Sequence, residues 1–229
     1  ILSHENMASR EPIFEQYDKQ VQGRVHTETG LADSGVMAPF NSEKYPEEIR
    51  NIGIALYTDH DPRYGLIDPY WGGVNAVVES MRNVAAVGAT PHALSDCLCF
   101  GNPEKPHQMW EFIEAVRGVA DTCHAITLKD HTDHATPIIA GNVSFYNESK
   151  NGAIPPSPIV SCLGRLKDIN KTVPAHFQET DSTLIMIGDR KNELGGSVYY
   201  SLKNELGANV PKPNLEEVKN QRFALTDCI

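Results

Sequence analysis

The sequence predicts an α/β (α+β) fold in which a mixed β-sheet is covered by helices. Apolar runs of strand length, such as residues 51–60 and 137–147, alternate along the 229 residues with longer segments of helical periodicity. Two of these segments, residues 74–87 and 106–125, place apolar side chains at spacings of three and four. A chain of this length buries a sizeable core without disulfide or metal staples, so we expect the helices to pack on the sheet.

The first third of the chain predicts one helix, two strands and a loop. Ser9 is a candidate N-cap, Pro12 lies in the first turn, and one face is apolar, so residues 9–22 are expected to be helical. Strands are expected at residues 35–40 and 51–60. The segment DPRYGLIDPYWGG that follows is rich in Pro and Gly, which predicts a loop.

The middle of the chain alternates helices and strands. The helix at residues 74–87 is expected to end at Gly88. The helix at 106–125 has an apolar side formed by Met109, Phe112, Ile113, Val116, Val119 and Cys123. Strands are expected at 92–101, 137–147 and 157–166, with a polar connector at 127–136.

A polar, Pro-containing passage at about residues 167–182 predicts a domain boundary. We therefore expect one domain over residues 1–170 and the start of a second over 171–229. The apolar run at 182–189 is interpreted as a new strand, followed by one or two helices. One strand and one or two helices are too few elements for a complete domain. The second domain is therefore expected to be truncated.

Composition excludes several classes of partner. The chain carries 20 Lys plus Arg against 30 Asp plus Glu, a net charge of −10, which argues against nucleic acid and anionic membranes. No apolar run approaches the ~18 residues needed to cross a bilayer, so no membrane association is expected. The cysteines are odd in number and irregularly spaced, which favours a reduced, cytoplasmic location. Cys97 and Cys99 lack a second cysteine pair for a metal site, so two small buried thiols are the favoured interpretation.

The helix at 74–87 carries a polar stripe formed by Asn75, Glu79, Arg82 and Asn83. Glu79 and Asn83 are one turn apart and could both direct oxygen atoms at a hard cation such as Mg²⁺. A solvated helix face with a Glu–Arg pair explains the same residues. Spacing alone favours that second interpretation.

Two strand ends carry residues of ligand type. Asp96 lies near the end of one predicted strand, and Gly141, Asn142 and Ser144 lie at the end of another. Strand ends converge in clefts, so we expect these residues to cluster at one edge of the sheet and face the same cleft. An Asx-turn at Asn142 would explain the second group equally well. The glycine run NELGGS at 192–197 fits either a phosphate cradle or a turn.

Several segments together resemble phosphoribosylformylglycinamidine synthase, the ATP-dependent synthetase of the fourth step of purine biosynthesis. They occur in the order expected for that family and extend over nearly the whole chain, as ASREPIFEQYDKQVQ, DPYWGGVNAVVESMRNVAAVGATP, SDCLCFGNPEKP, FIEAVRGVAD, AGNVSFYNES and ELGGS. The resemblance implies membership of the aminoimidazole ribonucleotide synthetase superfamily. It also implies an N-terminal-type nucleotide-binding domain followed by the start of a C-terminal-type domain.

The resemblance implies a reaction and a set of site residues. Formylglycinamide ribonucleotide, glutamine-derived ammonia and ATP would give formylglycinamidine ribonucleotide, ADP and phosphate. Asp96 and Gly141 would bind ATP, Asn142 a Mg²⁺, and Ser144 the substrate. A structural ADP site of large relatives would have its metal ligands here at Asp33, Glu79 and Asn83.

The resemblance also implies partners. The chain looks like the second half of the synthetase, so the first half of the same enzyme and a glutaminase domain or subunit are expected partners. The family's catalytic histidines lie in that first half, so the chain alone is expected to be inactive. A non-catalytic half that holds ADP and Mg²⁺ and docks the catalytic half is the alternative. The connector at 127–136 is longer than usual and is expected to be a surface insertion.

Overall fold

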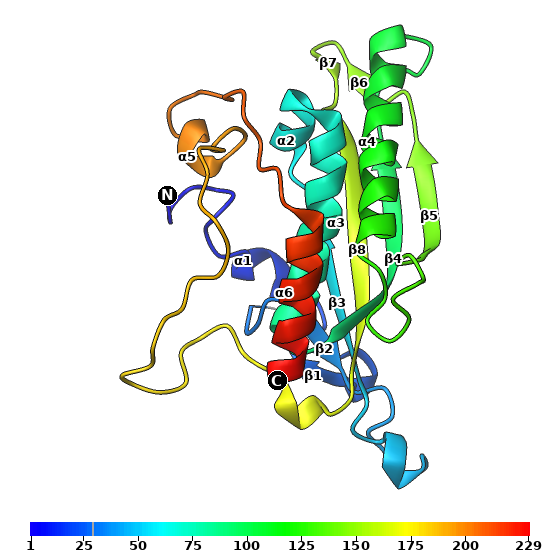
Figure 1. Ribbon diagram of the computed structural model, residues 1–229, viewed down its shortest axis with the longest axis vertical. Coiled ribbons are helices and arrows are strands. Elements are labelled where there is room, and N and C mark those ends of the chain that lie inside the picture. Colours follow the sequence, from blue (N-terminus) through cyan, green and yellow to red (C-terminus); the bar gives the residue numbers. More distant parts are fainter. Residues whose placement is uncertain (29) are drawn as a thin grey trace.

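The computed structural model describes residues 1–28 and 30–229. Its centre is a six-stranded mixed sheet with the strand order β1-β2-β3-β8-β4-β5 (Figure 1). The neighbours β4 and β5 run parallel, and the other neighbouring strands of this sheet run antiparallel. The strands are Val25–Thr27 (β1), Gly35–Met37 (β2), Gly53–Asp59 (β3), Thr90–Cys99 (β4), Ile138–Ser144 (β5) and Ser157–Leu166 (β8), with a separate hairpin of Glu148–Ser149 (β6) and Gly152–Ala153 (β7).

Three helices, α3, α4 and α6, lie on the same side of the sheet, with α6 packed against α3 and α4 (Figure 1). This arrangement confirms the predicted α/β fold with covering helices. None of the described helices is long and apolar enough to cross a membrane. The α-helices are Glu11–Phe14 (α1), Pro62–Ile67 (α2), Pro69–Ala86 (α3), Pro106–Ala125 (α4), Val198–Ser201 (α5) and Leu215–Cys228 (α6), and the 3-10 turns are Val21–Gly23 (η1), Glu47–Ile49 (η2) and Ile169–Lys171 (η3).

Helices α3 and α4 cross closely because each carries a glycine at the crossing. A Cβ added to Gly73 would overlap the backbone carbonyl of Ala115, and one added to Gly118 would overlap the carbonyl of Tyr70. Both helices confirm the prediction, and α4 has the predicted bounds. Met109 and Ile113, expected on its apolar side, are nevertheless 38% and 50% exposed, because they lie beyond the edge of the buried stripe.

The segment at residues 61–73, predicted to be a loop, is helical. Asp61 accepts a hydrogen bond from the backbone N–H of Arg63 at 2.8 Å, and Asp68 accepts one from Trp71 at 3.3 Å. Each aspartate is followed by a proline at the first helical position. Proline there loses no hydrogen bond, so the prolines that suggested a loop instead begin α2 and α3.

Two other predicted elements are not formed. The helix expected at 9–22 is reduced to the single turn α1 and to η1, and its apolar residues Ile13 and Tyr17 are 60% and 67% exposed. The strand expected at 182–189 has no regular structure, and Ile185 is 80% exposed. Both segments are apolar enough to pack, but neither finds an apolar surface to cover, and helices or strands outside a core are marginal.

Alternation along the strands gives the sheet two different faces. The covered face points toward the helices and contributes Ala55, Leu94, Val160, Cys162 and Leu166 to the buried core. The open face points away from them and is formed by Met37, Leu56, Thr58, Ser95, Cys97, Cys99, Ile159, Ser161, Leu163, Asn142 and Ser144. Met37 and Leu56 are 45% and 51% exposed, so this face is not buried by the helices.

Helix α6 brings residues beyond the predicted boundary onto the first domain. Val218 joins the main core, and Arg222 is only 3% exposed. The Arg222 guanidinium donates to the backbone carbonyl of Thr127 at 2.6 Å. Burial lowers the pKa of Arg222 to about 10. The connector at 127–136 is closed at its base by a bridge between Thr127 and Ala135, and its tip is exposed.

Candidate functional site

The predicted ligand residues lie on β4 and β5, the parallel pair at one edge of the sheet. In the register of this pair, Asp96 is opposite Gly141, Cys97 is opposite Asn142, and Cys99 is opposite Ser144. The sequence prediction that these strand ends are neighbours is therefore confirmed. The carboxyl ends of parallel strands form the usual ligand crevice of α/β sheets.

Asp96 and Gly141 lie together on the covered face. A Cβ added to Gly141 would overlap the Asp96 carboxylate, so the carboxylate lies directly over the bare glycine. Burial raises the pKa of the Asp96 carboxyl, and a hydrogen bond from the backbone of Asn142 partly opposes that rise. Burial raises the pKa of the Cys123 thiol on α4 to about 11, and the charge of Asp96 adds to that rise.

Asn142 and Ser144 point to the open face. The Asn142 side-chain amide donates to the Cys97 sulfur at 3.4 Å, and the Asn142 side chain is otherwise exposed. The expectation that Asp96, Asn142 and Ser144 share one cleft is therefore wrong. Asn142 is paired with Cys97, the residue that follows Asp96 on β4. Because successive side chains along a strand point to opposite faces, Asp96 and Asn142 lie on opposite sides of the sheet.

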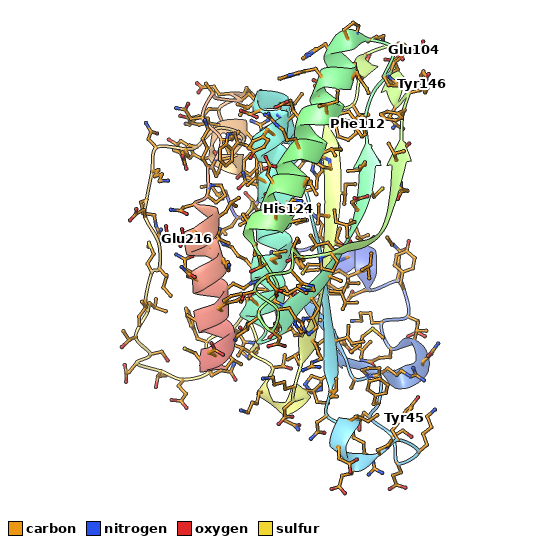
Figure 2. The ribbon with its side chains drawn as sticks, turned by 45° about the vertical axis from the view of Figure 1, so that its right-hand side comes forward. Tyr45, Glu104, Phe112, His124, Tyr146 and Glu216 are labelled. Atoms are coloured by element: carbon orange, nitrogen blue, oxygen red, sulfur yellow. The ribbon has the colours of Figure 1, made fainter. Side chains whose placement is uncertain are left out.

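Asn147, which the sequence reasoning missed, holds the two strand ends together. Its side-chain amide donates to the carbonyls of Phe100 at 3.0 Å and Ser144 at 2.9 Å, and to the Ser144 hydroxyl at 3.0 Å. The turn above it is closed by Tyr146, whose hydroxyl reaches Glu104 at 3.5 Å (Figure 2). The sequence signal for this role was the asparagine that follows the strand. Asparagine side chains at such positions often hydrogen-bond to nearby backbone groups.

The three residues expected around a structural nucleotide, Asp33, Glu79 and Asn83, do not line one hollow. Asp33 and Asn83 line a hollow of about 320 Å³ between α3 and α6. Glu79 lies one turn earlier on α3, where loss of solvent and the charge of Asp61 raise the pKa of its carboxyl. Charges on Glu79 and Asp33 both contribute to a raised pKa of Tyr57, after burial and Asp59. These carboxylate and amide oxygens are of the type that Mg²⁺ prefers.

A second acidic group at the end of β3 was not predicted. Burial, with the charges of Glu79 and Asp61, raises the pKa of Asp59 to about 7. Burial lowers the pKa of the neighbouring His60 to about 4, and neither of its ring nitrogens has a hydrogen-bond partner among residues 1–28 and 30–229. The signal in the sequence was the run TDHD after an apolar strand. Among the described residues, no three His, Cys, Asp or Glu side chains are arranged to hold a metal ion by themselves.

The glycine run at 192–197 is used for a turn. The backbone N–H of Gly195 donates to Asn209 at 2.8 Å, and that of Gly196 donates to Leu206 at 2.7 Å. Gly196 has a φ of +77°, which glycine adopts at little cost. Because both N–H groups already have partners, the turn interpretation is favoured over the phosphate cradle.

The fold and its edge site match a known class of protein. Residues 36–166 match the family described as AIR synthase related protein, N-terminal domain, so the chain belongs to that family. The match begins in β2 and ends at the last residue of β8, and it contains Asp96, Gly141, Asn142 and Ser144. The covered sheet of this chain is therefore the N-terminal domain of an AIR synthase related protein.

More particular relatives agree with the predicted resemblance. Phosphoribosylformylglycinamidine synthase subunit PurL of Methanothrix thermoacetophila is 46% identical over 230 residues, covering 100% of this chain and 29% of that subunit. The subunit of Streptomyces coelicolor is 41% identical over 220 residues, covering 94% of this chain and 27% of its own. The chain thus spans less than a third of the length of these curated relatives.

Solved structures of one such subunit share the fold. The PurLQS structure from Thermotoga maritima has a TM-score of 0.56 and 27% identity, covering 72% of this chain and 25% of that one. Thermotoga maritima PurL complexed with ATP has a TM-score of 0.54 and 26% identity, covering 72% and 24%. The same protein complexed with FGAR has a TM-score of 0.51 and 26% identity, with the same coverage.

Proposed function

We propose that the chain is part of the ATP-dependent ligase that makes formylglycinamidine ribonucleotide in purine biosynthesis. The reaction consumes formylglycinamide ribonucleotide, ATP and ammonia derived from glutamine, and releases ADP and phosphate. The observation that carries the proposal is 46% identity along the whole chain to a phosphoribosylformylglycinamidine synthase subunit. Structural relatives complexed with ATP, ADP and FGAR support it. A cytoplasmic location follows from that pathway.

The site residues receive roles that fit their surroundings. Asp96 and Gly141 are assigned to ATP, and the Asp96 carboxylate, which lies over Gly141, is the group that would meet the nucleotide. Asn142 offers an amide oxygen to Mg²⁺, and Ser144 offers a hydroxyl to the substrate phosphate. Asp96 and Asn142 lie on opposite faces of the sheet, so these roles require a ligand that reaches both faces at the carboxyl ends of β4 and β5.

The chemistry requires charge neutralisation more than covalent catalysis. In the reaction proposed, the γ-phosphoryl group of ATP is transferred to the formyl-amide oxygen, and ammonia then displaces phosphate. Mg²⁺ supplies positive charge to the phosphates when bound. The contribution of this chain is to position that charge through the Asn142 amide, which makes only one hydrogen bond within the described residues.

The open face is the proposed docking surface for the first half of the synthetase. Its apolar part, around Met37 and Leu56, is half exposed and continuous with the strand ends that carry Asn142 and Ser144. A half-exposed apolar sheet face is suited to burial against a second domain.

We propose that the first half of the synthetase and a glutaminase are the partners of this chain. We also propose that the chain alone does not form product. Residues 171–229 then begin the following domain.

The test uses Asn142→Ala in the full synthetase, supplied with ammonia, ATP and formylglycinamide ribonucleotide. Loss of one strong transition-state contact predicts a rate about a hundredfold lower. Asn151→Ala, in the exposed turn between β6 and β7, is the matched control and should keep its rate. Near-normal kinetics with a lower melting temperature would instead support the Asx-turn interpretation of Asn142.

A second function is favoured by the hollow between α3 and α6. Asp33 and Asn83 line it, and Glu79 is one helical turn before Asn83. We propose that these residues hold the Mg²⁺ of a structural ADP. If so, ADP with Mg²⁺ should raise the melting temperature of the chain, and Asp33→Asn should abolish that rise. A thermal shift that persists in Asp33→Asn would contradict this assignment.

A further inference from the structure

Two thiols lie next to each other on the open face. The sulfur atoms of Cys97 and Cys99 are 3.7 Å apart on β4, and both side chains are partly exposed. The expectation that both thiols are buried is therefore wrong. Residues two apart on a strand share a face, and Cys97 and Cys99 share the face that points away from the helices. Cys123 and Cys162, which face the helices, are the buried thiols.

We propose that Cys97 and Cys99 form a binding site for a thiophilic divalent cation such as Zn²⁺ or Cd²⁺. Zinc–sulfur bonds of about 2.3 Å at a tetrahedral angle place two thiolates about 3.8 Å apart. The observed 3.7 Å separation matches that requirement without movement of the strand. Thiolate ligands select cations of this class over Mg²⁺.

Polar residues of β5 are paired with the two cysteines of β4. Asn142 is opposite Cys97 in the register, and Ser144 is opposite Cys99. The Asn142 amide already lies 3.4 Å from the Cys97 sulfur, and rotation of that amide by half a turn would present its oxygen. Two rows of the open face, separated by the row of Leu98 and Val143, thus supply two sulfur donors and the Asn142 amide oxygen. The Ser144 hydroxyl, which hydrogen-bonds with Asn147, lies in the second of these rows.

The geometry favours a bridging ion over a disulfide. A disulfide requires the sulfurs to approach to about 2.05 Å, with Cα atoms in a restricted range. Strand β4 is hydrogen-bonded to β8 on one side and to β5 on the other through this region, which resists contraction of the strand. A bridging cation needs no such contraction.

Cation binding here would affect the proposed synthetase site. Asn142 cannot serve both the thiol-bound cation and Mg²⁺, so a thiophilic cation should inhibit the full synthetase. This consequence rests on the proposed function, whereas cation binding itself does not.

The test is titration of the reduced 229-residue chain with Cd²⁺ alone, followed by sulfur-to-cadmium charge-transfer absorbance. The expected result is saturation at one Cd²⁺ per chain. Cys97→Ser and Cys99→Ser should each lower the affinity for Cd²⁺ by at least about tenfold. Loss of a residue that only hydrogen-bonds to a metal ligand already lowers metal affinity by about that factor, and each cysteine is itself a ligand. Cys228→Ser, which removes a lone exposed thiol, is the matched control and should bind as the unmodified chain does.

Circular dichroism of each variant shows whether the sheet is retained, and Cys97→Ala serves if the serine variant does not fold. Absence of the absorbance band, or a band that survives when both Cys97 and Cys99 are replaced, would overturn the proposal. Cadmium binding to the full synthetase without inhibition would leave the cation site in place and count against the role of Asn142.

Discussion

The two faces of the sheet are built from the same strands but carry different chemistry. On the covered face, core residues such as Leu94 and Val160 are almost fully buried, and Asp59 and Asp96 have raised pKa values because the helices exclude water. On the open face, small polar residues and thiols stand beside half-exposed apolar side chains. The covered face therefore supplies much of the buried core, and the open face keeps its side chains partly exposed. Which face a side chain occupies is set by its position along the strand, because successive residues point to opposite faces.

The largest difference between the faces should appear when matched leucines are shortened. Leu166→Ala, on the covered face at 2% exposure, should lower the free energy of unfolding by about 2–5 kcal/mol. Leu56→Ala, at 51% exposure on the open face, should cost less than about 1 kcal/mol. Urea denaturation measures both. Equal losses would mean that the open face is part of the core.

Glycines give a second comparison. Gly73→Ala places a methyl group against the Ala115 carbonyl at the α3–α4 crossing and should cost about 1–3 kcal/mol. Gly35→Ala, on the open face where a Cβ meets nothing within 4 Å, should change stability by no more than about 0.5 kcal/mol. Thermal unfolding separates the two, and a tolerated alanine at Gly73 would show that the helices can move apart.

A pH series tests the covered carboxyl of Asp59. Its folded pKa of about 7 exceeds the unfolded value of about 3.9, so its contribution is full below pH ~4 and is lost as the pH rises through about 7. Asp59→Asn should therefore be more stable than the unmodified chain at pH 8, by about 1–2 kcal/mol after allowance for partial exposure. The two should converge near pH 4. Asp133→Asn, on the exposed connector, is the control, and no gain at pH 8 for Asp59→Asn would contradict the burial argument.

A charge on the open face should affect self-association more than stability. Leu56→Lys should change the free energy of unfolding by less than about 1 kcal/mol and yet reduce self-association of the isolated chain at high concentration. Leu66→Lys, an equally exposed leucine on α2, is the matched control. Sedimentation velocity measures the association. A strictly monomeric unmodified chain would remove the basis for this prediction.

The sequence predicted the elements of the sheet well because their signals are local. The bounds of α4 follow from Pro106 and the apolar spacing that runs to Ala125, and β3, β4, β5 and β8 follow from apolar runs. The start of α3 was missed because Pro69 was interpreted as a helix breaker, although Asp68 caps the helix before it. The helix predicted at 9–22 and the strand predicted at 182–189 were wrong because each needs an apolar surface to pack on. No local sequence pattern shows whether such a surface exists.

The proximity of the candidate site residues was predicted, and the faces that they occupy were not. Gly141, Asn142 and Asp96 were recognised as ligand types at strand ends, and the register confirms that they are neighbours. Which face each occupies depends on pairing between strands about 45 residues apart, where a shift of one residue reverses every side chain. Asp59 was missed because its raised pKa comes first from burial in the folded chain and then from the charge of residues on other elements, Glu79 among them.

The position of β8 has a consequence for the order of folding. It is the last strand of the sheet in the chain, yet it lies between β3 and β4 and pairs with both. During synthesis, β1–β3 and the β4–α4–β5 unit are complete before the strand that joins them exists, and each presents an unpaired edge to the cell. Pairing of Gly53 with Leu166 closes a long loop, which is characteristic of slow folding. Chaperone dependence of the nascent chain should therefore end only after residue 166 has left the ribosome.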